Sequence, residues 1–167
     1  MKIAKEFTAQ SIFRLNENVP RIEKCLNLVT EEQVWKKPNS SSNSIANLIL
    51  HLCGNIMQYI VSSLGEQPDL RQRDSEFTIT KELSKKELLI KLEITVSTAV
   101  SVIENLSRED LHGERSVQGF QFSGIGSIIH VVEHFSYHTG QIAVLTKLMV
   151  DQDLGFYSGL DLNVKNQ

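Results

Sequence analysis

The sequence predicts an all-α fold, an up-down four-helix bundle with short irregular linkers. In four long segments, apolar residues recur at the three- and four-residue spacing of amphipathic helices. Proline and glycine are sparse, with three prolines and nine glycines in 167 residues, so the helices should run with few breaks. Long helices with short connections are typical of a bundle. The length fits one domain, which we expect to span residues 1–167.

The first two helices are expected on either side of a polar loop. The first should cover residues 4–29, and Pro20 lies inside it, where a kink or break is expected. Trp35 is expected to anchor the following connection against the bundle. An Asn/Ser-rich stretch then marks the start of the second helix, which should cover residues 43–64.

The last two helices are expected around a short turn. Ser84 is a candidate N-cap of the third helix, because Glu87 follows it at the spacing of a capping box. This helix should end near residue 106. Residues 113–124 are expected to form a turn or a short β-ribbon, and the fourth helix should follow from there to residue 150.

The second helix carries an uncharged polar stripe. No charged side chain occurs between Pro38 and Gly65. At about 100° per residue, six polar residues fall on one face, which we call the polar seam: Ser44, Asn47, His51, Asn55, Gln58 and Ser62. A face turned to water usually carries Lys or Glu, so we interpret the seam as buried, lining an internal pocket with His51 at its middle. The alternative is a solvent-facing stripe that merely lacks charge. The remaining apolar surface is wide enough for a bundle neighbour and a second subunit, which predicts a homodimer.

The segment HVVEHFSYHTGQ of the fourth helix places three histidines at intervals of four. On a helical wheel His134 and His138 face the core, whereas His130 drifts towards the edge. Two imidazoles four residues apart can reach one metal ion, although such a pair is more commonly hydrogen-bonded in a core. His51 on a neighbouring helix favours a metal site of His51, His134 and His138. Three histidines leave a coordination position open, as in catalytic sites. Phe135 stands where the zinc-protease motif HExxH has Glu, so that mechanism is not supported.

Other residues near this cluster are open to two interpretations. Tyr137 and Gln141 are candidates to hydrogen-bond a metal-bound water or a ligand, or else to pack at the core edge. His130 either supports the ligands or lies at the surface. Gly140 is expected to permit a close helix approach.

Two arginines in the linker after the second helix are candidate substrate anchors. Arg71 and Arg73 could each bind a carboxylate through a bidentate contact. The alternative is a salt bridge to Asp74 or Glu76. Catalytic and cofactor-binding residues stay unassigned.

Composition excludes some function classes. The net charge of −3 and pI near 6.0 predict no nucleic-acid partner. The N-terminus has no signal-peptide pattern, and no run of 18 apolar residues occurs, so no membrane span is expected. Cys25 and Cys53 lie far apart and form no CxxC pair, which favours reduced, buried thiols and a cytoplasmic location.

The stretches NSIANLILHLCGNIMQYI and HVVEHFSYHTGQIAVLTKL together resemble the DinB/YfiT-like superfamily of four-helix metalloproteins. The order of features matches: a tryptophan-containing loop, a histidine in the second helix, then HxxxH followed by a small residue, Gly and Gln. The resemblance implies His51, His134 and His138 as the metal triad and no ligand role for His130. It also implies a divalent ion such as nickel or zinc, and a homodimer. The segment RQRDSEF resembles a branch whose function is largely unassigned.

The resemblance also suggests a reaction class. Some members transfer low-molecular-weight thiols such as bacillithiol, mycothiol or glutathione to electrophiles, and others isomerise maleylpyruvate with a thiol. It therefore implies a metal-dependent enzyme, a thiol S-transferase in which the ion favours the nucleophilic thiolate. The alternatives are a metal-dependent hydrolase, a non-catalytic metal-binding or stress-related protein, and a dimeric structural protein with vestigial histidines.

Overall fold

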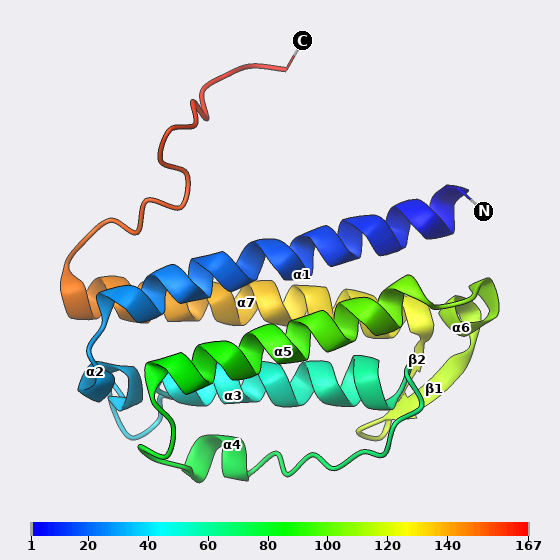
Figure 1. Cartoon of the computed structure of the whole chain (residues 1–167), viewed down its shortest axis with the longest axis horizontal. Coiled ribbons are helices and arrows are strands. Elements are labelled where there is room, and N and C mark those ends of the chain that lie inside the picture. Colours follow the sequence, from blue (N-terminus) through cyan, green and yellow to red (C-terminus); the bar gives the residue numbers. More distant parts are fainter. Residues whose placement is uncertain (1, 167) are drawn as a thin grey trace.

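Four long helical segments form a bundle in the computed structural model, which describes residues 2–166 (Figure 1). They are α1 (Lys2–Leu28), α3 (Ile45–Ile56) continued by the π-helix η1 (Met57–Ser62), α5 (Lys85–Glu104) and α7 (Gly124–Val150). The shorter elements are α2 (Glu31–Trp35), α4 (Ser75–Thr78), α6 (Arg108–His112), β1 (Glu114–Val117) and β2 (Phe120–Ser123). The all-α bundle is confirmed. The single domain over residues 1–167 stays a prediction, and its end residues Met1 and Gln167 lie outside the described part.

The long helices do not alternate strictly in direction. α1 packs on α5 and α7, and α3 packs on the same two helices. α1 and α7 run one way, whereas α3 and α5 run the other way (Figure 1). The order is therefore up-down-down-up. The reason is the connection of residues 63–84, which we call the crossover segment. It carries the chain back along the bundle before α5 begins, and it is long where the sequence predicted a short linker.

Local sequence determines where several elements begin. Ser84 and Glu87 form the predicted capping box of α5. The predicted β-ribbon is an antiparallel hairpin of β1 and β2. Its two central residues, Gln118 and Gly119, have φ of 52° and 82°, as a type I′ turn requires.

Two expectations for the first part of the chain have different outcomes. α1 continues through Pro20 as one helix, so of the predicted kink or break the break is wrong, and the kink stays a prediction. Packing against α5 and α7 along the helix stabilises it where the proline removes one hydrogen bond. The anchoring role of Trp35 is confirmed, because its indole Nε1–H donates to the carbonyl of Leu83 at 2.9 Å and the residue is 8% exposed.

The helix formed by α3 and η1 lies in the core. By length and composition Ile45–Ser62 could cross a membrane, but 78% of it is buried inside the bundle. A central bundle helix has the same composition, so this feature is weak evidence for a membrane span. Within this fully described helix, Met57 is the one large apolar side chain that is exposed, at 41%. The apolar surface that the sequence assigned to a second subunit is therefore covered by the chain itself.

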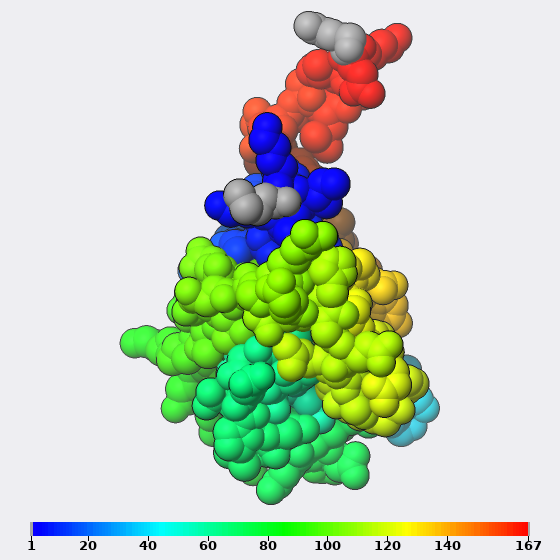
Figure 2. Space-filling view, turned by 90° about the vertical axis from the view of Figure 1, so that its right-hand side faces the viewer, coloured from blue at the N-terminus to red at the C-terminus, as the bar shows by residue number. Residues whose placement is uncertain are grey.

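The chain ends in an extended tail. Residues 151–166 leave the C-terminal end of α7 without forming a helix or strand. Its first residues pack on the bundle, where Leu154 is 2% exposed and Lys24 Nζ donates to the carbonyl of Gly155 at 3.0 Å, and Figure 2 shows the last part of the tail standing away from the bundle. The tail therefore packs on α1 at its start and lies outside the bundle at its end.

Candidate metal centre

Helices α3 and α7 bring the three predicted histidines together. His51 lies in the middle of α3 and is buried, while His134 and His138 lie on one face of α7 and are half-buried. The ring centroids are 4.8 Å apart for His51 and His134, 5.0 Å for His51 and His138, and 4.4 Å for His134 and His138. One ring nitrogen from each residue lies within 4.8 Å of the others.

The inner nitrogens have a spacing that suits a metal ion. His134 Nε2 lies 3.1 Å from His51 Nε2 and 3.2 Å from His138 Nε2. In a tetrahedral site with bonds of about 2.1 Å, ligand nitrogens lie about 3.4 Å apart. Two of the three nitrogen pairs therefore lie within a few tenths of an ångström of that spacing, and the third pair lies within 4.8 Å.

The outer nitrogens determine where two of the protons lie. His51 Nδ1–H donates to Glu76 Oε2 at 2.8 Å, and His138 Nδ1–H donates to Gln141 Oε1 at 2.7 Å. In neutral rings, both Nε2 atoms therefore carry lone pairs. His134 has at most one N–H to share between them, and its buried Nδ1 has no hydrogen-bond partner. A cation satisfies all three inner lone pairs, which a hydrogen-bond network cannot do.

Burial keeps the α7 histidines neutral. Burial first, and then the neighbouring His138 and His51, lower the pKa of His134 to about 3. Burial also lowers the pKa of His138, although its hydrogen bond to Gln141 acts in the opposite direction. Neutral imidazole is the form that coordinates metal ions, so the chemistry of the donor set fits a divalent ion.

The rest of the polar seam is paired with the crossover segment and α7. Asn47 and Asn55 are buried like His51, as the sequence predicted. Asn47 Nδ2–H donates to the carbonyl of Glu76 at 2.9 Å, and Gln58 Nε2–H donates to Asp69 Oδ2 at 2.7 Å. The seam therefore anchors a covering segment as well as contributing His51 to the centre.

His130 belongs to a separate pair one turn along α7. Its Nε2 accepts a hydrogen bond from Asn55 Nδ2–H at 3.1 Å, and its ring stacks on Tyr59 with centroids 4.2 Å apart. Burial lowers its pKa. The ring also stacks on His134 at 5.5 Å, but its nitrogen points to Asn55 and does not join the three-histidine group.

The other residues of the HVVEHFSYHTGQ segment now have defined positions. Gln141 orients His138, whereas Tyr137 is 62% exposed and touches His138 edge-on at 5.0 Å. The interpretation of Gly140 is wrong, because a Cβ atom there would meet nothing within 4 Å. Gly140 lines an open hollow beside Ser41 and Ser42 instead of a helix contact.

Sequence reasoning missed the role of Glu76. This residue lies on α4, is 8% exposed, and contacts both His51 and Arg71. Burial raises its pKa, but hydrogen bonds from His51 and Arg71 outweigh burial and leave the pKa below the ordinary value. The sequence pattern indicates Glu76 only as a possible salt-bridge partner of Arg71 or Arg73. A further signal was that a buried His51 requires a partner for its second nitrogen.

The two arginines of the crossover segment do not act alike. Arg71 forms the salt bridge to Glu76, at 2.7 Å from Nε to Oε1, and its side chain is 4% exposed. Its bidentate contact is thus made to a carboxylate of the chain itself. Arg73 lies over the ring of Phe77 at 5.1 Å.

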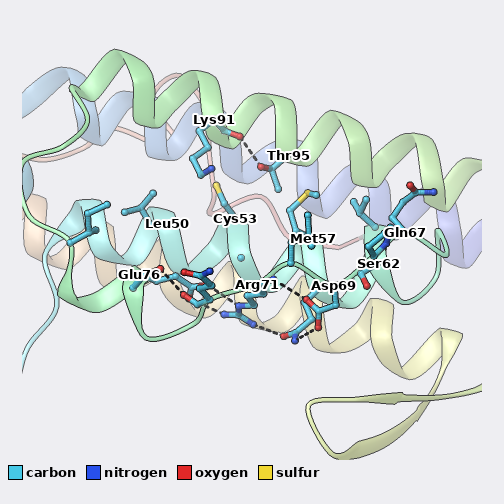
Figure 3. Close-up of a pocket in the computed structure, with 18 of the residues that line it drawn as sticks. Leu50, Cys53, Met57, Ser62, Gln67, Asp69, Arg71, Glu76, Lys91 and Thr95 are labelled. Atoms are coloured by element: carbon cyan, nitrogen blue, oxygen red, sulfur yellow. Dashed lines mark hydrogen bonds and ion pairs between the residues drawn. The ribbon is translucent and has the colours of Figure 1, made fainter.

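Two hollows lie near the centre. One is lined by His134 together with His130, Glu133, Ser136 and Tyr137, and it opens on the surface of α7. The other, of about 450 Å³, lies on the far side of Glu76 between α3, α5 and the crossover segment (Figure 3). The second hollow contains none of the three histidines, whereas the first is lined by one of them, His134.

Neither cysteine is a ligand or an activated nucleophile. Cys25 and Cys53 are both free and buried. Burial raises the pKa of Cys25, and it raises the pKa of Cys53 to about 11. Both thiols therefore stay protonated at neutral pH, and thiolate is the reactive form.

Several solved structures share this fold. A DinB-like protein of Bacillus subtilis (YjoA) has a TM-score of 0.68 at 20% identity, covering 89% of this chain and 96% of that one. A conserved protein of Enterococcus faecalis has a TM-score of 0.73 at 17% identity, covering 87% and 98%. At these identities the likeness establishes the fold alone.

A third similar structure has a named reaction. The mycothiol-dependent maleylpyruvate isomerase has a TM-score of 0.65 at 13% identity, and the match covers 81% of this chain and 60% of that one. None of the curated protein sequences matches the chain. The family model "Protein of unknown function (DUF1572)" matches residues 2–158. Together with the DinB-like folds, this match confirms the DinB/YfiT-like resemblance.

Proposed function

The chain belongs to the DUF1572 family, and from that premise we propose that it is a divalent-metal protein whose ligands are His51, His134 and His138. The finer proposal is a metal-dependent thiol S-transferase. Nickel and zinc are the proposed ions, although three neutral imidazoles suit several divalent metals. When bound, such an ion would favour the thiolate form of a coordinated thiol.

One observation carries the metal proposal. The Nε2 atoms of all three histidines converge, while the opposite nitrogens of His51 and His138 carry protons that they donate to the acceptors Glu76 and Gln141. Three histidine ligands leave at least one coordination position for an outside molecule. His134 lines the hollow on α7, which supports an approach of such a molecule from that side.

The state of the protein's own sulfur supports an external thiol. Cys25 and Cys53 are buried and protonated, so neither supplies the nucleophile. A transferase built on this centre requires a small thiol that enters through the hollow on α7. His130, beside His134 in that hollow, is a candidate contact for the thiol or for the electrophile. The mycothiol dependence of a structurally similar isomerase supports the same class of co-substrate.

Two other functions use the same centre. A hydrolase would use the open position for a water molecule of lowered pKa, and a metal-binding or stress-related protein would perform no chemistry. The buried, acceptor-tied histidines support metal binding in all three cases. The accessible hollow beside His134 favours an enzyme.

Metal analysis of the protein purified without a histidine tag tests whether the chain binds a metal ion. We expect about one divalent ion per chain, as three-histidine sites hold. An ion-free protein that also fails to take up zinc or nickel at neutral pH would contradict metal binding.

A thiol-conjugation assay tests the proposed thiol S-transferase activity. The metal-loaded protein is offered bacillithiol, mycothiol and glutathione with a panel of electrophiles, and the chelator-treated protein is the control. Conjugation that requires both the ion and one of the thiols is expected. Failure with every thiol would leave the non-catalytic role, and ester or amide cleavage without a thiol would favour the hydrolase.

Assembly and location are also proposals. We retain the homodimer, but the face of a second copy cannot be the covered surface of α3. Large apolar side chains are exposed on α7 instead, at Ile129, Val144 and Leu148. Sedimentation as a monomer at micromolar concentration would contradict the dimer. Two free, buried cysteines favour the proposed cytoplasmic location.

A further inference from the structure

We propose that Glu76, clamped by Arg71, is a positioning residue that fixes the proton and the ring orientation of His51. The crossover segment then sets how tightly the three-histidine centre binds its ion. This inference rests on the proposed metal-binding function, and it assigns a role to residues that neither the family match nor the similar structures explain.

The carboxylate of Glu76 is bound on both oxygens. Oε2 accepts from His51 Nδ1–H at 2.8 Å and from Arg71 Nη2–H at 2.9 Å, while Oε1 accepts from Arg71 Nε–H at 2.7 Å. A buried carboxylate is costly unless its charge is compensated and its oxygens are hydrogen-bonded. Arg71 meets both requirements, so Glu76 remains an acceptor for His51.

Arg71 is itself fixed by a closed set of contacts (Figure 3). Its Nη1–H donates to Gln58 Oε1 at 2.9 Å, and the other end of the same amide donates to Asp69 Oδ2 at 2.7 Å. The second oxygen of Asp69 accepts from the backbone N–H of Arg71 at 3.1 Å. The guanidinium therefore cannot swing away from Glu76 without breaking contacts to η1 and to its own segment.

The backbone of α3 is shaped to receive this group. A Cβ atom at Gly54 would overlap Oε1 of Glu76, so the carboxylate approaches the helix where no side chain stands. Asn47 Nδ2 contacts the carbonyls of Glu76 and Ile79, at 2.9 and 3.3 Å, and so holds α4 against the first turn of α3. The His51 ring also touches Phe77, with centroids 4.9 Å apart.

The geometry has one chemical consequence for the centre. An ionised carboxylate only accepts hydrogen bonds, so it holds the proton of His51 on Nδ1 and leaves the lone pair on Nε2 facing His134. Without Glu76 the ring is free to carry its proton on Nε2, where a metal ion must displace it. The ring is also free to rotate, and the ion must then order it on binding.

Metal titration of the tag-free, chelator-treated chain tests the proposal. Zinc binding is measured in competition with a chromophoric chelator for the native chain, Glu76→Gln and Glu76→Leu. Partners of this kind are worth about 10–100-fold in metal affinity, so we expect a loss in that range for Glu76→Leu and a smaller loss for Glu76→Gln. The matched control is Glu17→Gln, because Glu17 also forms salt bridges, to Arg14 and Arg21, but lies on α1 and contacts none of the three histidines. Its affinity should stay within about twofold of the native value.

The proton itself provides a readout that stability alone would not move. Nitrogen NMR of the metal-free protein reports which ring nitrogen of His51 is protonated. We expect Nδ1–H in the native chain and in Glu17→Gln, and a shift towards Nε2–H in Glu76→Leu. If Glu76→Leu fails to fold, the same two measurements on Glu76→Gln decide.

The outcomes separate this inference from the proposed function. Unchanged zinc affinity together with an unchanged His51 proton in folded Glu76 variants would overturn the positioning role while leaving the metal site intact. A native chain that binds no metal would end the proposed function, and the NMR measurement on the same metal-free samples would still decide whether Glu76 fixes the proton of His51.

Discussion

Two histidine contacts join α3 and α7, one helical turn apart, and only one belongs to a group with the geometry of a metal centre. His134 faces His51, and His130 faces Asn55. Both α7 residues are half-buried, both have lowered pKa values, and their rings stack on each other. Their environments on α7 are therefore similar, and the partner on α3 makes the difference.

The difference teaches that the arrangement of lone pairs matters more than histidine spacing. At His130 an amide N–H meets the ring nitrogen at 3.1 Å, so one hydrogen bond satisfies it. At His134 two ring nitrogens without protons approach, from His51 and His138. Those two rings carry their protons on Nδ1, in hydrogen bonds to Glu76 and Gln141. In the first arrangement a donor meets the ring nitrogen, and in the second a cation is required to satisfy the nitrogens that meet.

The strongest way to break this comparison is to remove one histidine from the three-histidine centre and, separately, the histidine that binds Asn55. His138→Ala should reduce the metal content of the untagged protein from about one ion per chain to none measurable, because two histidines on separate helices hold an ion poorly. His130→Leu should keep the ion. Elemental analysis of both variants checks this, and equal losses would mean that the two contacts are not distinct.

Bound metal should add to the free energy of unfolding only where the three-histidine centre is intact. Free zinc at 100 times its dissociation constant should stabilise the native chain and His130→Leu by about 2.7 kcal/mol. It should leave His138→Ala unchanged. Urea unfolding with and without the ion measures this linkage, and an equal gain in His138→Ala would indicate binding elsewhere.

The hydrogen bond between His130 and Asn55 can be tested through the free energy of unfolding. His130→Leu leaves the buried amide of Asn55 without its partner, and its Oδ1 already lacks one. This should lower the free energy of unfolding by about 1–3 kcal/mol. Adding Asn55→Leu should restore most of the loss, because two apolar side chains then replace both polar groups. A double variant less stable than His130→Leu would contradict the hydrogen-bonded pair.

The smallest effect is expected where water can replace a partner. Gln141 is half-buried, so after Gln141→Ala a water molecule can accept from His138 Nδ1–H. We expect metal affinity to fall by less than about tenfold, below the range given for outer partners. The chelator competition that is used for Glu76 measures it, and a larger loss in Gln141→Ala than in Glu76→Leu would reverse the ranking.

The sequence was sufficient for the local features. Capping residues located the start of α5, a charge-free helix identified the buried seam, and periodicity on α7 separated His130 from His134. These depend on residues a few positions apart. The encounter of Glu76 with His51 depends on the path of residues 63–84, which reverses the chain and is not encoded in any short pattern. The open position of Gly140 likewise depends on which segment lies opposite.

The long return of the chain through residues 63–84 also bears on the order of events during folding. The groups around His51 come from positions 25 residues away, at Glu76, and 83 residues away, at His134. Closing such loops costs chain entropy before any contact forms. We therefore expect the three histidines to meet late, after the helices have docked. In that order, the ion enters a bundle that is already assembled and does not act as its nucleus.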